Sequence, residues 1–583
     1  LFQLPRSSWQ DYRRELISTG GGVFSRGQKS IPLSEAMKRL TGLSQAETTP
    51  HQLMNALLKA KVDLIWLGGI GTYIKSSSET HADVGDRAND AIRVNASEIA
   101  ARVIGEGANL GVTQRGRIEF ARGGGRLNTD AIDNSAGVNS SDMEVNIKIA
   151  LGAAEQAGRL DRAGRNKLLA DMTEEVAALV LRNNYLQTLS LSLAVARGTE
   201  ENSYAIMLMH ELEQRGLLAR EFEALPQDAE VKARDARREM LTRPEWAVLL
   251  AYAKIALNHD LLNSDVPDDE YLSKELLRYF PERMSAGYEK ESRQHRLRRE
   301  IVATMLTNSM INRGGPGFVA RLRSETGANA AQIAAAFAVA RDSFGLVGHN
   351  GSIDRLDGKI PAGLQIQLYL ELQTLARRAT QWFLRNTQLE TGLHHVVERF
   401  RSGIEELKAS LSDHLPAAAL QALESKVEKL TSEGVSDDVA GIIAQASYLQ
   451  RAPDIVQVAA ECDSTLAATA KVLYATGAHF DIDGILRRAS DLVAKDFFER
   501  LAINRTIDQV FFAHRVFTMQ VLNAEGRSER PWESWLAAHE ARAQGVLKTI
   551  GELLVEKPFD LAKLSVAQGL LWDLATTQSA SRP

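Results

Sequence analysis

One neutral amide, Asn109, stands where it could bind an uncharged group of a ligand. It lies in the run Arg102–Gly111, in which a short apolar segment ends in a turn of small residues. An amide can donate to a ribose or a carboxamide, and accept from it, without adding charge. The alternative interpretation is an asparagine that only stabilises its own turn, and the spacing leaves both readings open.

A second glycine-rich turn follows the apolar run Val62–Leu67. Gly68, Gly69 and Gly71 stand at its end. Glycines at such a place let the backbone adopt positive φ and approach a ligand closely. The dinucleotide motif G-x-G-x-x-G is incomplete because Ile74 occupies the third glycine position, so this turn is a weak signal by itself.

Ser141 is a further candidate for a chemical role. It stands three residues before Glu144, at the start of a helix that we expect to begin near residue 140. That spacing is typical of a capping box, in which Ser141 would be the N-cap. The same helix N-terminus could instead bind a carboxylate, because its free N–H groups and dipole favour an anion. Both interpretations can hold for neighbouring residues.

The elements that would position these residues are strands first and helices afterwards. Val62–Leu67, Arg102–Ile104 and Ile118–Ala121 are short apolar runs that stop at or near glycine, which is typical of parallel strands in an α/β sheet. Ligands bind at the carboxyl ends of such strands. The first 150 residues are therefore predicted to be α/β.

From about residue 138 onward the pattern is helical. Met143, Ile147, Leu151 and Ala154 recur at steps of three and four, on one face of a helix. Further helices are predicted at Trp246–Asn258 (after a capping box at Thr242 and Glu245), His295–Arg313, Ala330–Phe344 and Leu364–Phe383. We therefore predict a mostly helical protein, with an all-α domain at 151–583 and a break near 345–390.

At the turns the sequence resembles glutamate dehydrogenases. Glu106–Asn109 is similar to their "EGAN" turn, and Asn134–Glu144 resembles their "NAGGVATSGLEM". The resemblance implies that Asn109 and Asn134 lie beside the nicotinamide half of NAD, and that Val138 and Ser141 contact the distal carboxylate of glutamate. The other cofactor-binding residues that it implies are Gly68, Gly69, Gly71, Glu106 and Gly107.

A longer resemblance is to the very large bacterial NAD-dependent glutamate dehydrogenases. It runs through "LPRSSWxDY", "GGGVFSR", "SSETHAxVGDRAND", "GEGANLGVT" and "NTDAIDNSAGV" to "RPEWAVLLAYAKI" at Arg243–Ile255. It implies that residues 1–150 form the distal half of a Rossmann-type NAD-binding domain, and that the chain is the C-terminal portion of such an enzyme. The catalytic Lys and Asp and the glycine-rich pyrophosphate loop would lie upstream, so no catalytic residue is predicted here and the fragment alone is expected to be inactive.

Two other functions remain open from the sequence. One is a helical regulatory or oligomerisation module without catalysis, in which the basic cluster around His295 (Arg293, His295, Arg296, Arg298 and Arg299) is a solvated helix face or an anionic effector site. The other is a related amino-acid dehydrogenase for a branched or aromatic substrate. Ser141 argues against it, because a hydroxyl suits a carboxylate better than an apolar side chain.

The composition argues against some classes of partner. The formal net charge of -5 over 583 residues gives no electrostatic reason to expect nucleic acid or an anionic membrane. The single cysteine, Cys462, cannot form an internal disulfide or a Cys-rich metal site, so no metal is predicted and a reducing cytoplasm is expected. The expected partners are L-glutamate and 2-oxoglutarate, a second copy of the chain in a homo-oligomer, and a small-molecule allosteric effector.

Overall fold

The computed structural model describes residues 7–389, 392–526 and 528–576, in which helix predominates as predicted. The chain divides into two compact units. Unit 1 comprises Leu1–Asn258 and Lys274–Gly317, and unit 2 comprises His259–Ser273 and Phe318–Pro583. Each unit has its own buried core. Our predicted domains, 1–150 and 151–583 with a break near 345–390, stay predictions.

The strands of unit 1 are short and pair in twos within the described residues. They are β1 (Ile31–Pro32), β2 (Glu47–Thr48), β3 (Leu64–Leu67), β4 (Ile74–Lys75), β5 (Val94–Asn95) and β6 (Val103–Glu106). The pairs β3–β6 and β4–β5 are parallel, whereas β1–β2 is antiparallel. Two of the three predicted strand runs therefore pair in parallel, in a sheet of two strands.

The third predicted strand is wrong. Ile118–Ala121 lies inside helix α4 (Gln114–Arg122), which begins after the N-cap Thr113. The Thr113 hydroxyl accepts from the Gly116 N–H and so supplies a helix start. Ile118 and Phe120 are buried on this helix, and a four-residue apolar run cannot by itself distinguish a buried helix face from a strand.

A small apolar core lies between these strands and α4. It is formed by residues from β3, β4, β5, β6, the turns that follow them and α4, namely Leu67, Ile74, Val94, Ala96, Ile104, Val112, Phe120 and Leu127. The other short helices of this part are α1 (Glu35–Thr41), α2 (Pro50–Leu58), α3 (His81–Val84) and α5 (Asp130–Asp133). The core holds one face of the β3–β6 pair, while Leu64 and Trp66 on the other face are exposed.

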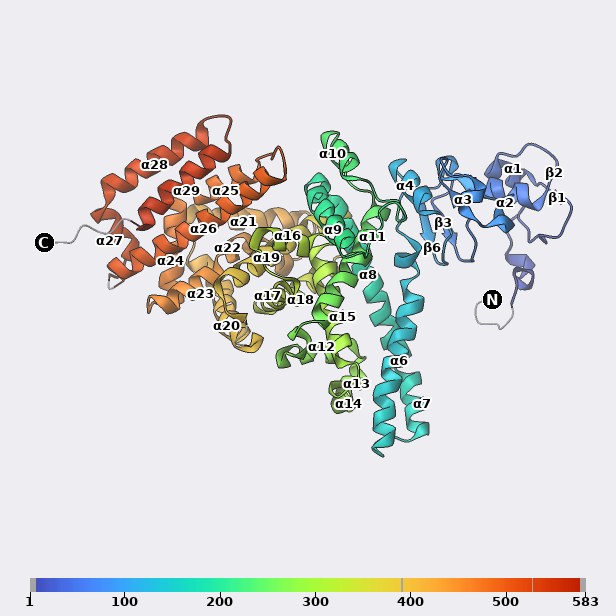
Figure 1. Cartoon of the computed structure of the whole chain (residues 1–583), viewed down its shortest axis with the longest axis horizontal. Helices are drawn as coiled ribbons and strands as arrows, with labels where there is room; N and C mark the ends of the chain where they lie inside the picture. Colours follow the sequence, from blue (N-terminus) through green and yellow to red (C-terminus); the bar gives the residue numbers. More distant parts are fainter. Residues whose placement is uncertain (1–6, 390–391, 527, 577–583) are drawn as a thin grey trace. The chain divides into compact units, whose positions relative to one another are not determined.

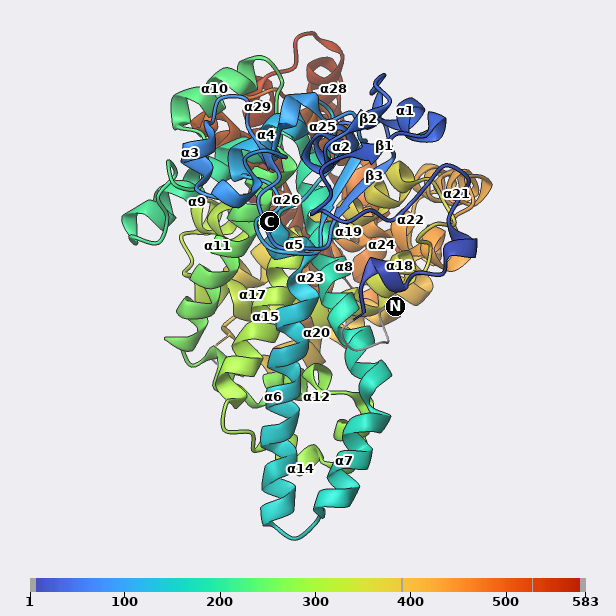
Figure 2. The ribbon, with the colours of Figure 1, turned by 90° about the vertical axis from the view of Figure 1, so that its right-hand side faces the viewer.

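Long helices form the rest of unit 1. They are α6 (Ser135–Gln156), α7 (Arg162–Asp171), α8 (Thr173–Arg197), α9 (Asn202–Gln214), α10 (Asp228–Ala236), α11 (Arg243–Leu262), α12 (Lys274–Tyr279), α13 (Glu282–Gly287), α14 (Glu289–Arg293) and α15 (Arg298–Gly314). Helix α6 runs away from the strands, and α7 and α8 return beside it (Figure 1; Figure 2). The predicted face Met143, Ile147, Leu151 and Ala154 is buried, so that prediction is confirmed.

Two further helix predictions can be compared with the structure. Helix α11 begins at Arg243, and the Glu245 carboxylate accepts from the Thr242 N–H at 2.6 Å, as expected of a capping box. The helix predicted from His295 begins only at Arg298. His295 is buried, and its Nε2 lies 3.2 Å from the Asn146 carbonyl oxygen. The interpretation of this stretch as a solvated helix face is therefore wrong for His295, because that ring packs inside unit 1.

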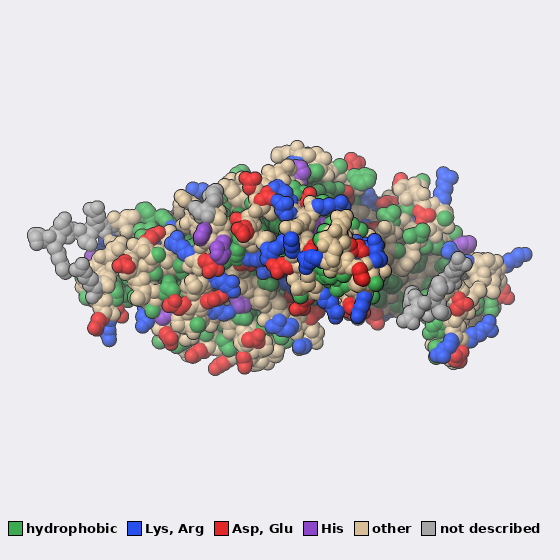
Figure 3. Space-filling view, turned by 90° about the horizontal axis from the view of Figure 1, so that it is seen from below, with side chains coloured by type: hydrophobic (Ala, Val, Ile, Leu, Met, Phe, Trp, Pro, Cys, Tyr) green, Lys and Arg blue, Asp and Glu red, His purple; other side chains and the backbone are tan. Residues whose placement is uncertain are grey.

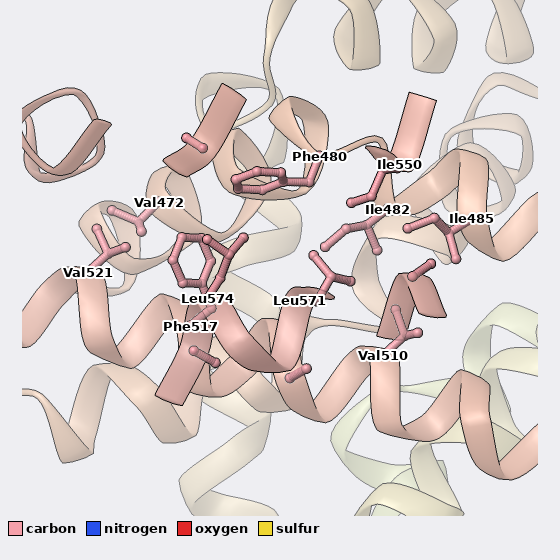
Figure 4. Close-up of a cluster of buried hydrophobic side chains, with 14 of the residues drawn as sticks. Val472, Phe480, Ile482, Ile485, Val510, Phe517, Val521, Ile550, Leu571 and Leu574 are labelled. Carbon is pink, nitrogen blue, oxygen red and sulfur yellow. The ribbon is translucent and has the colours of Figure 1, made fainter. Parts of the chain in front are cut away.

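Unit 2 is helical throughout its described residues. Its helices are α16 (Phe318–Thr326), α17 (Ala330–Ser343), α18 (Leu346–Asp354), α19 (Ala362–Asn386), α20 (Leu393–Ser410), α21 (Ala417–Ser432), α22 (Asp437–Leu449), α23 (Ala452–Glu461), α24 (Leu466–His479), α25 (Ile482–Ser490), α26 (Phe497–Glu525), α27 (Pro531–Ala538), α28 (Glu540–Val555) and α29 (Leu561–Thr576). Phe480, Phe517 and Leu571 belong to a large apolar cluster built by the last of these helices (Figure 4).

Two features of the structure concern membrane association, namely the charged surface and the length of the helices. Acidic and basic side chains are interspersed over the face drawn in Figure 3. Among the described residues no single helix is long and apolar enough to cross a bilayer. Only α17 and α18 together meet the length and composition criteria, and they are bent by 69° where they join.

Candidate functional site

The two glycine-rich turns predicted from the sequence lie next to each other. Strands β3 and β6 are paired in parallel, with Leu67 opposite Glu106, so the turns that follow them leave the same edge. The Ala108 N–H donates to the Leu67 carbonyl at 3.0 Å, and the Tyr73 N–H donates to the Gly111 carbonyl at 2.9 Å. Gly68–Gly71 and Gly107–Gly111 are thus held together at both ends, at the carboxyl edge where ligands bind parallel strands.

The side chain of Glu106 fixes the second turn from inside. It has no exposed surface, and its carboxylate accepts from Arg117 Nε at 2.7 Å and Nη2 at 2.8 Å. It also accepts from the Val112 N–H at 3.2 Å. Burial raises the pKa of the Glu106 carboxyl, and the Arg117 guanidinium opposes that shift. Glu106 therefore positions the turn, and its carboxylate is fully engaged within the protein.

Asn109 and Asn134 are brought into direct contact. Asn134 Nδ2 donates to Asn109 Oδ1 at 2.5 Å, although the two residues are 25 positions apart. Each amide carries two N–H groups and one oxygen. The bond therefore leaves the N–H groups of Asn109 and the oxygen of Asn134 for another partner. A neighbouring donor and acceptor of this kind match a carboxamide, which needs one of each.

The residue after Asn109 has an unusual backbone conformation. Leu110 has φ 61°, in the left-handed region, and its N–H donates to Asp130 Oδ2 at 2.8 Å. Left-handed backbone is unfavourable for a side chain as large as leucine, and such residues concentrate at ligand sites. The Asp130 carboxylate also lies 3.0 Å from Arg117 Nη2, so the conformation is tied to the buried ion pair.

The predicted glycines serve different purposes. A Cβ atom on Gly107 would lie 2.3 Å from the ring of Trp66, so glycine at this position leaves room for the indole. Trp66 is 62% exposed and covers the turn. Gly71 has φ 123°, which excludes most other residues. Gly68 and Gly69 are exposed, and a Cβ on Gly69 would meet open space. A Cβ on Gly68 would lie 3.3 Å from Trp66 Nε1, so of these glycines Gly69 leaves the most room for a ligand to approach the backbone.

Helix α6 begins earlier than the sequence indicated, and the predicted capping box is wrong. The helix starts at Ser135, directly after Asn134, so Ser141 lies in its interior. The Glu144 side chain pairs with Lys148 one turn later. The start of α6 could not be predicted from the sequence, because α5 ends at Asp133 and α6 begins at Ser135 with only Asn134 between them. Ser141 is therefore not at a helix N-terminus, and the anion-binding argument based on the dipole does not apply to it.

The earlier start nevertheless places three predicted residues on one face of α6. Asn134, Val138 and Ser141 are spaced by four and three positions, which superposes them along a helix. The rise per residue separates Asn134 from Ser141 by about 10 Å. Val138 is 73% exposed and Ser141 is exposed. The structure thus gathers Asn109, Asn134, Val138 and Ser141 along one accessible stripe that starts at the strand ends.

A supporting network was missed by the sequence analysis. Asp133 Oδ2 accepts from the Glu106 N–H at 3.0 Å, and Asp133 Oδ1 accepts from Asn128 Nδ2 at 2.6 Å. Arg243, the first residue of α11, donates from Nε to Asn128 Oδ1 at 2.5 Å. Burial lowers the pKa of Arg243 to about 10. Glu106 and Asp133 are 27 residues apart in sequence, and Asn128 and Arg243 are 115 apart, so no local pattern could have linked the members of these pairs.

Among the described residues no group of three His, Cys, Asp or Glu side chains could hold a metal ion. Cys462 is half-buried in unit 2, and burial raises the pKa of its thiol, which disfavours the nucleophilic thiolate. The site at the strand ends offers amides, a hydroxyl and apolar surface, which suit binding and orientation.

Two family models match the chain. The model of the bacterial NAD-glutamate dehydrogenase catalytic domain matches residues 1–194, and the model of the glutamate dehydrogenase C-terminal region matches residues 238–573. The first match includes both turns and the stripe on α6. The second covers more than half of the chain.

Curated relatives align along almost the whole chain. An NAD-specific glutamate dehydrogenase of Pseudomonas aeruginosa is 41% identical over 578 residues, and one of Halomonas elongata is 40% identical over 584; each alignment covers 99% of this chain and 36% of the relative. An enzyme of the same name from Mycobacterium tuberculosis is 38% identical over 97% of this chain and 35% of its own length. The chain thus spans just over a third of the length of these relatives.

Proposed function

The chain belongs to the bacterial NAD-glutamate dehydrogenase family, and on that premise we propose that it supplies the nicotinamide side of an NAD-dependent glutamate dehydrogenase. The reaction is the oxidative deamination of L-glutamate to 2-oxoglutarate and ammonia. We propose that the chain represents the C-terminal portion of the enzyme, which is inactive without the catalytic Lys and Asp of the remainder. The description of the family model for residues 238–573 as C-terminal supports this.

The hydrogen bond between Asn109 and Asn134 is the observation that carries the proposal. It joins the turn after β6 to the start of α6 and leaves a donor and an acceptor side by side. These groups fit the carboxamide of NAD. When it is bound, NAD supplies the hydride acceptor. Asn109 and Asn134 would hold the ring, and Gly68 and Gly69 would border it. We propose that residues 1–150 form the distal half of a Rossmann-type domain, for which the parallel β3–β6 pair is the support.

Val138 and Ser141 are proposed to contact the distal carboxylate of glutamate. Their place on the same face of α6 as Asn134 supports this assignment, because substrate and nicotinamide must lie side by side for hydride transfer. The exposed hydroxyl of Ser141 can donate to a carboxylate. A branched or aromatic amino acid would leave that hydroxyl without a partner, so glutamate is the better substrate.

Steady-state kinetics of the full-length enzyme test the cofactor assignment. We expect Asn109→Ala to raise the apparent KM for NAD by about tenfold, since a lost hydrogen bond to a ligand costs about 1 kcal/mol or more. Asn139→Ala is the matched control, because it removes the same side chain from α6 about 140° around the helix from Asn134. The control should change the KM by less than twofold.

The opposite result would remove the assignment. If Asn109→Ala leaves the KM for NAD and kcat unchanged while the enzyme stays folded, Asn109 does not contact the cofactor. A parallel change in Asn109→Ala and Asn139→Ala would point to a general loss of stability instead.

A further inference from the structure

A cavity of unit 2 lies among α16, α19, α26 and the junction of α22 with α23, far along the chain from the turns described above. Its volume is about 500 Å³. All of its lining residues belong to unit 2. Five arginines line it: Arg378, Arg385, Arg451, Arg505 and Arg515.

The acidic residues of the lining neutralise only part of this charge. They are Glu325, Asp454 and Asp508, three carboxylates against five guanidinium groups. Each of these carboxylates already has hydrogen-bond or ion-pair partners within the protein. Asp508 accepts from Gln381 at 3.0 Å and from Arg385 at 2.8 Å, whereas Asp454 accepts from Trp382 at 2.7 Å and lies 3.4 Å from Arg515.

Glu325 is engaged by cations and amides on its other sides. It has 2% of its side chain exposed and lies 3.2 Å from Arg321 Nε and 3.7 Å from Arg377 Nη1, neither of which lines the cavity. It also accepts from Asn504 Nδ2 at 3.1 Å. This carboxylate therefore has little capacity left to balance the arginines that face the cavity.

Two of the arginines have no ion-pair partner in the described part of unit 2. Arg378 lies over the Phe511 ring, 5.1 Å from its centroid, and makes no hydrogen bond or ion pair with the described residues. Arg505 is exposed and is likewise without such a partner there. Excess positive charge in a partly enclosed space is the usual signature of an anion site.

A buried arginine adds a second, independent observation. Arg451 is 7% exposed and its Nη1 atom lies 3.3 Å from Asp454 Oδ2, but within the described structure its Nε atom has no hydrogen-bond partner. Burial lowers the pKa of Arg451 and also that of Arg378. Asp454 is shared between Arg451 and Arg515. Because buried cations are costly in the folded state unless they are fully paired, a bound anion would reduce that cost.

Two of the three aromatic rings in the lining, Phe511 and Phe512, restrict the kind of anion. Phe511 is covered by Arg378 and by Arg451, the latter 4.6 Å from its centroid. Phe512 is contacted by Arg515 and stacks on Trp572. These faces are occupied by guanidinium groups or by another ring, so they orient the arginines and are not available to stack a base. A compact anion fits this lining better than a nucleotide.

We propose that this cavity of unit 2 binds a small multivalent anion, a di- or triphosphate or a polycarboxylate, through Arg378, Arg505 and the neighbouring arginines. Planar guanidinium groups bind both phosphate and carboxylate oxygens in pairs. The cavity is built from unit 2 residues alone, and its assignment does not rest on the proposed function.

Isothermal titration calorimetry of the 583-residue chain tests the proposal, with ionic strength held constant by NaCl. Inorganic pyrophosphate and tricarballylate are the two probes, and they distinguish phosphate from carboxylate chemistry. We expect at least one of them to bind with one site per chain. Arg505→Gln, at an exposed position that should not affect folding, is expected to raise the Kd by tenfold or more, and Arg378→Gln should do the same.

Arg500→Gln is the matched control. It removes the same charge from the same helix, α26, at a position that does not line the cavity, and it should change the Kd by less than twofold. The proposal is overturned if neither anion binds the wild-type chain, or if Arg505→Gln and Arg378→Gln bind as tightly as Arg500→Gln.

Discussion

A carboxylate with no exposed surface supports the turn that presents Asn109. Glu106 joins Arg117, Val112 and, through its own N–H, Asp133, so that one residue connects β6 to α4 and α5. The "EGAN" resemblance led us to count Glu106 among the cofactor contacts, and no finding tests that role. Its partners indicate a positioning role instead. Sequence could locate the residue but not its partners, because Arg117 lies 11 positions away, next to the run Ile118–Ala121 that the sequence predicts as a strand and that belongs to α4.

Removing this carboxylate should be far more harmful than removing an exposed one. Glu106→Ala leaves Arg117 buried with only Asp130 to balance it, and breaking one side of a buried pair costs about 3–5 kcal/mol. Glu98→Ala removes a partly exposed partner of Lys59 and should cost less than about 1 kcal/mol. Urea unfolding of the chain, followed by tryptophan fluorescence, measures both. Equal losses in the two variants would contradict the positioning role.

A half-buried histidine of unit 2 should make stability depend on pH. Burial, aided by the Lys408 charge, lowers the pKa of His349 to about 4 from an ordinary value near 6.5. The unfolded chain therefore takes up the proton first as the pH falls, so the stabilisation by neutral His349 is complete above pH 6.5 and is lost towards pH 4.

His349→Gln should remove this part of the pH dependence. Between pH 6.5 and pH 5 the wild type should lose about 1.5 kcal/mol more unfolding free energy than the variant, because the unfolded-state histidine is half protonated at pH 6.5 and the slope reaches 1.36 kcal/mol per pH unit only below that pH. Urea titrations at the two pH values give the difference. Parallel pH profiles for the two proteins would show that His349 is protonated equally in the folded and unfolded states.

At the scale of elements, α6 determines the geometry of the proposed substrate site. Its buried face was predictable from the spacing of Met143, Ile147, Leu151 and Ala154, because apolar periodicity is set within the helix itself. Its start was not, since α5 and α6 meet at Asn134 without a proline or a strong cap. The resemblance named Val138 and Ser141, whereas their common face with Asn134 became clear only from the start of the helix at Ser135.

Two neighbouring serines on this helix test the stripe. Ser141→Ala in the full-length enzyme should raise the KM for glutamate about five- to tenfold with little change in the KM for NAD, since one hydrogen bond to a charged group is lost. Ser140→Ala removes the same hydroxyl about 100° around the helix, where it bonds the Ala136 carbonyl, and should have little effect. A larger effect for Ser140→Ala would place the substrate on another face of α6.

At the scale of the whole molecule, the helical character was predictable but the division into units was not. Long periodic segments identify helices such as α17 and α19 directly. The two units, however, each combine segments that are distant in sequence: unit 2 includes His259–Ser273, and Lys274–Gly317 returns to unit 1. Such an exchange depends on tertiary packing, which no local pattern reports. The unit 2 cavity was missed for the same reason, because its arginines come from separate helices.

We propose that the assembled enzyme is a homo-oligomer, and that a small-molecule effector controls it. Val493, Phe498 and Val555 of unit 2 are 92%, 76% and 78% exposed, and exposed apolar side chains of this size are often covered by another subunit. Size-exclusion chromatography with light scattering should give a mass above the 64.0 kDa of one chain. Phe498→Ser should shift that mass towards the monomer, whereas a clean monomer of the wild-type chain would contradict assembly through this unit.

The position of NAD in the full-length enzyme tests the central claim most directly. A structure with NAD and 2-oxoglutarate bound should place the nicotinamide carboxamide within about 3.2 Å of the Asn109 or Asn134 side chain, the limit of an ordinary hydrogen bond. It should also place the distal carboxylate of 2-oxoglutarate beside Ser141. A nicotinamide bound away from the edge where β3 and β6 end would contradict the account, whatever the enzyme's activity.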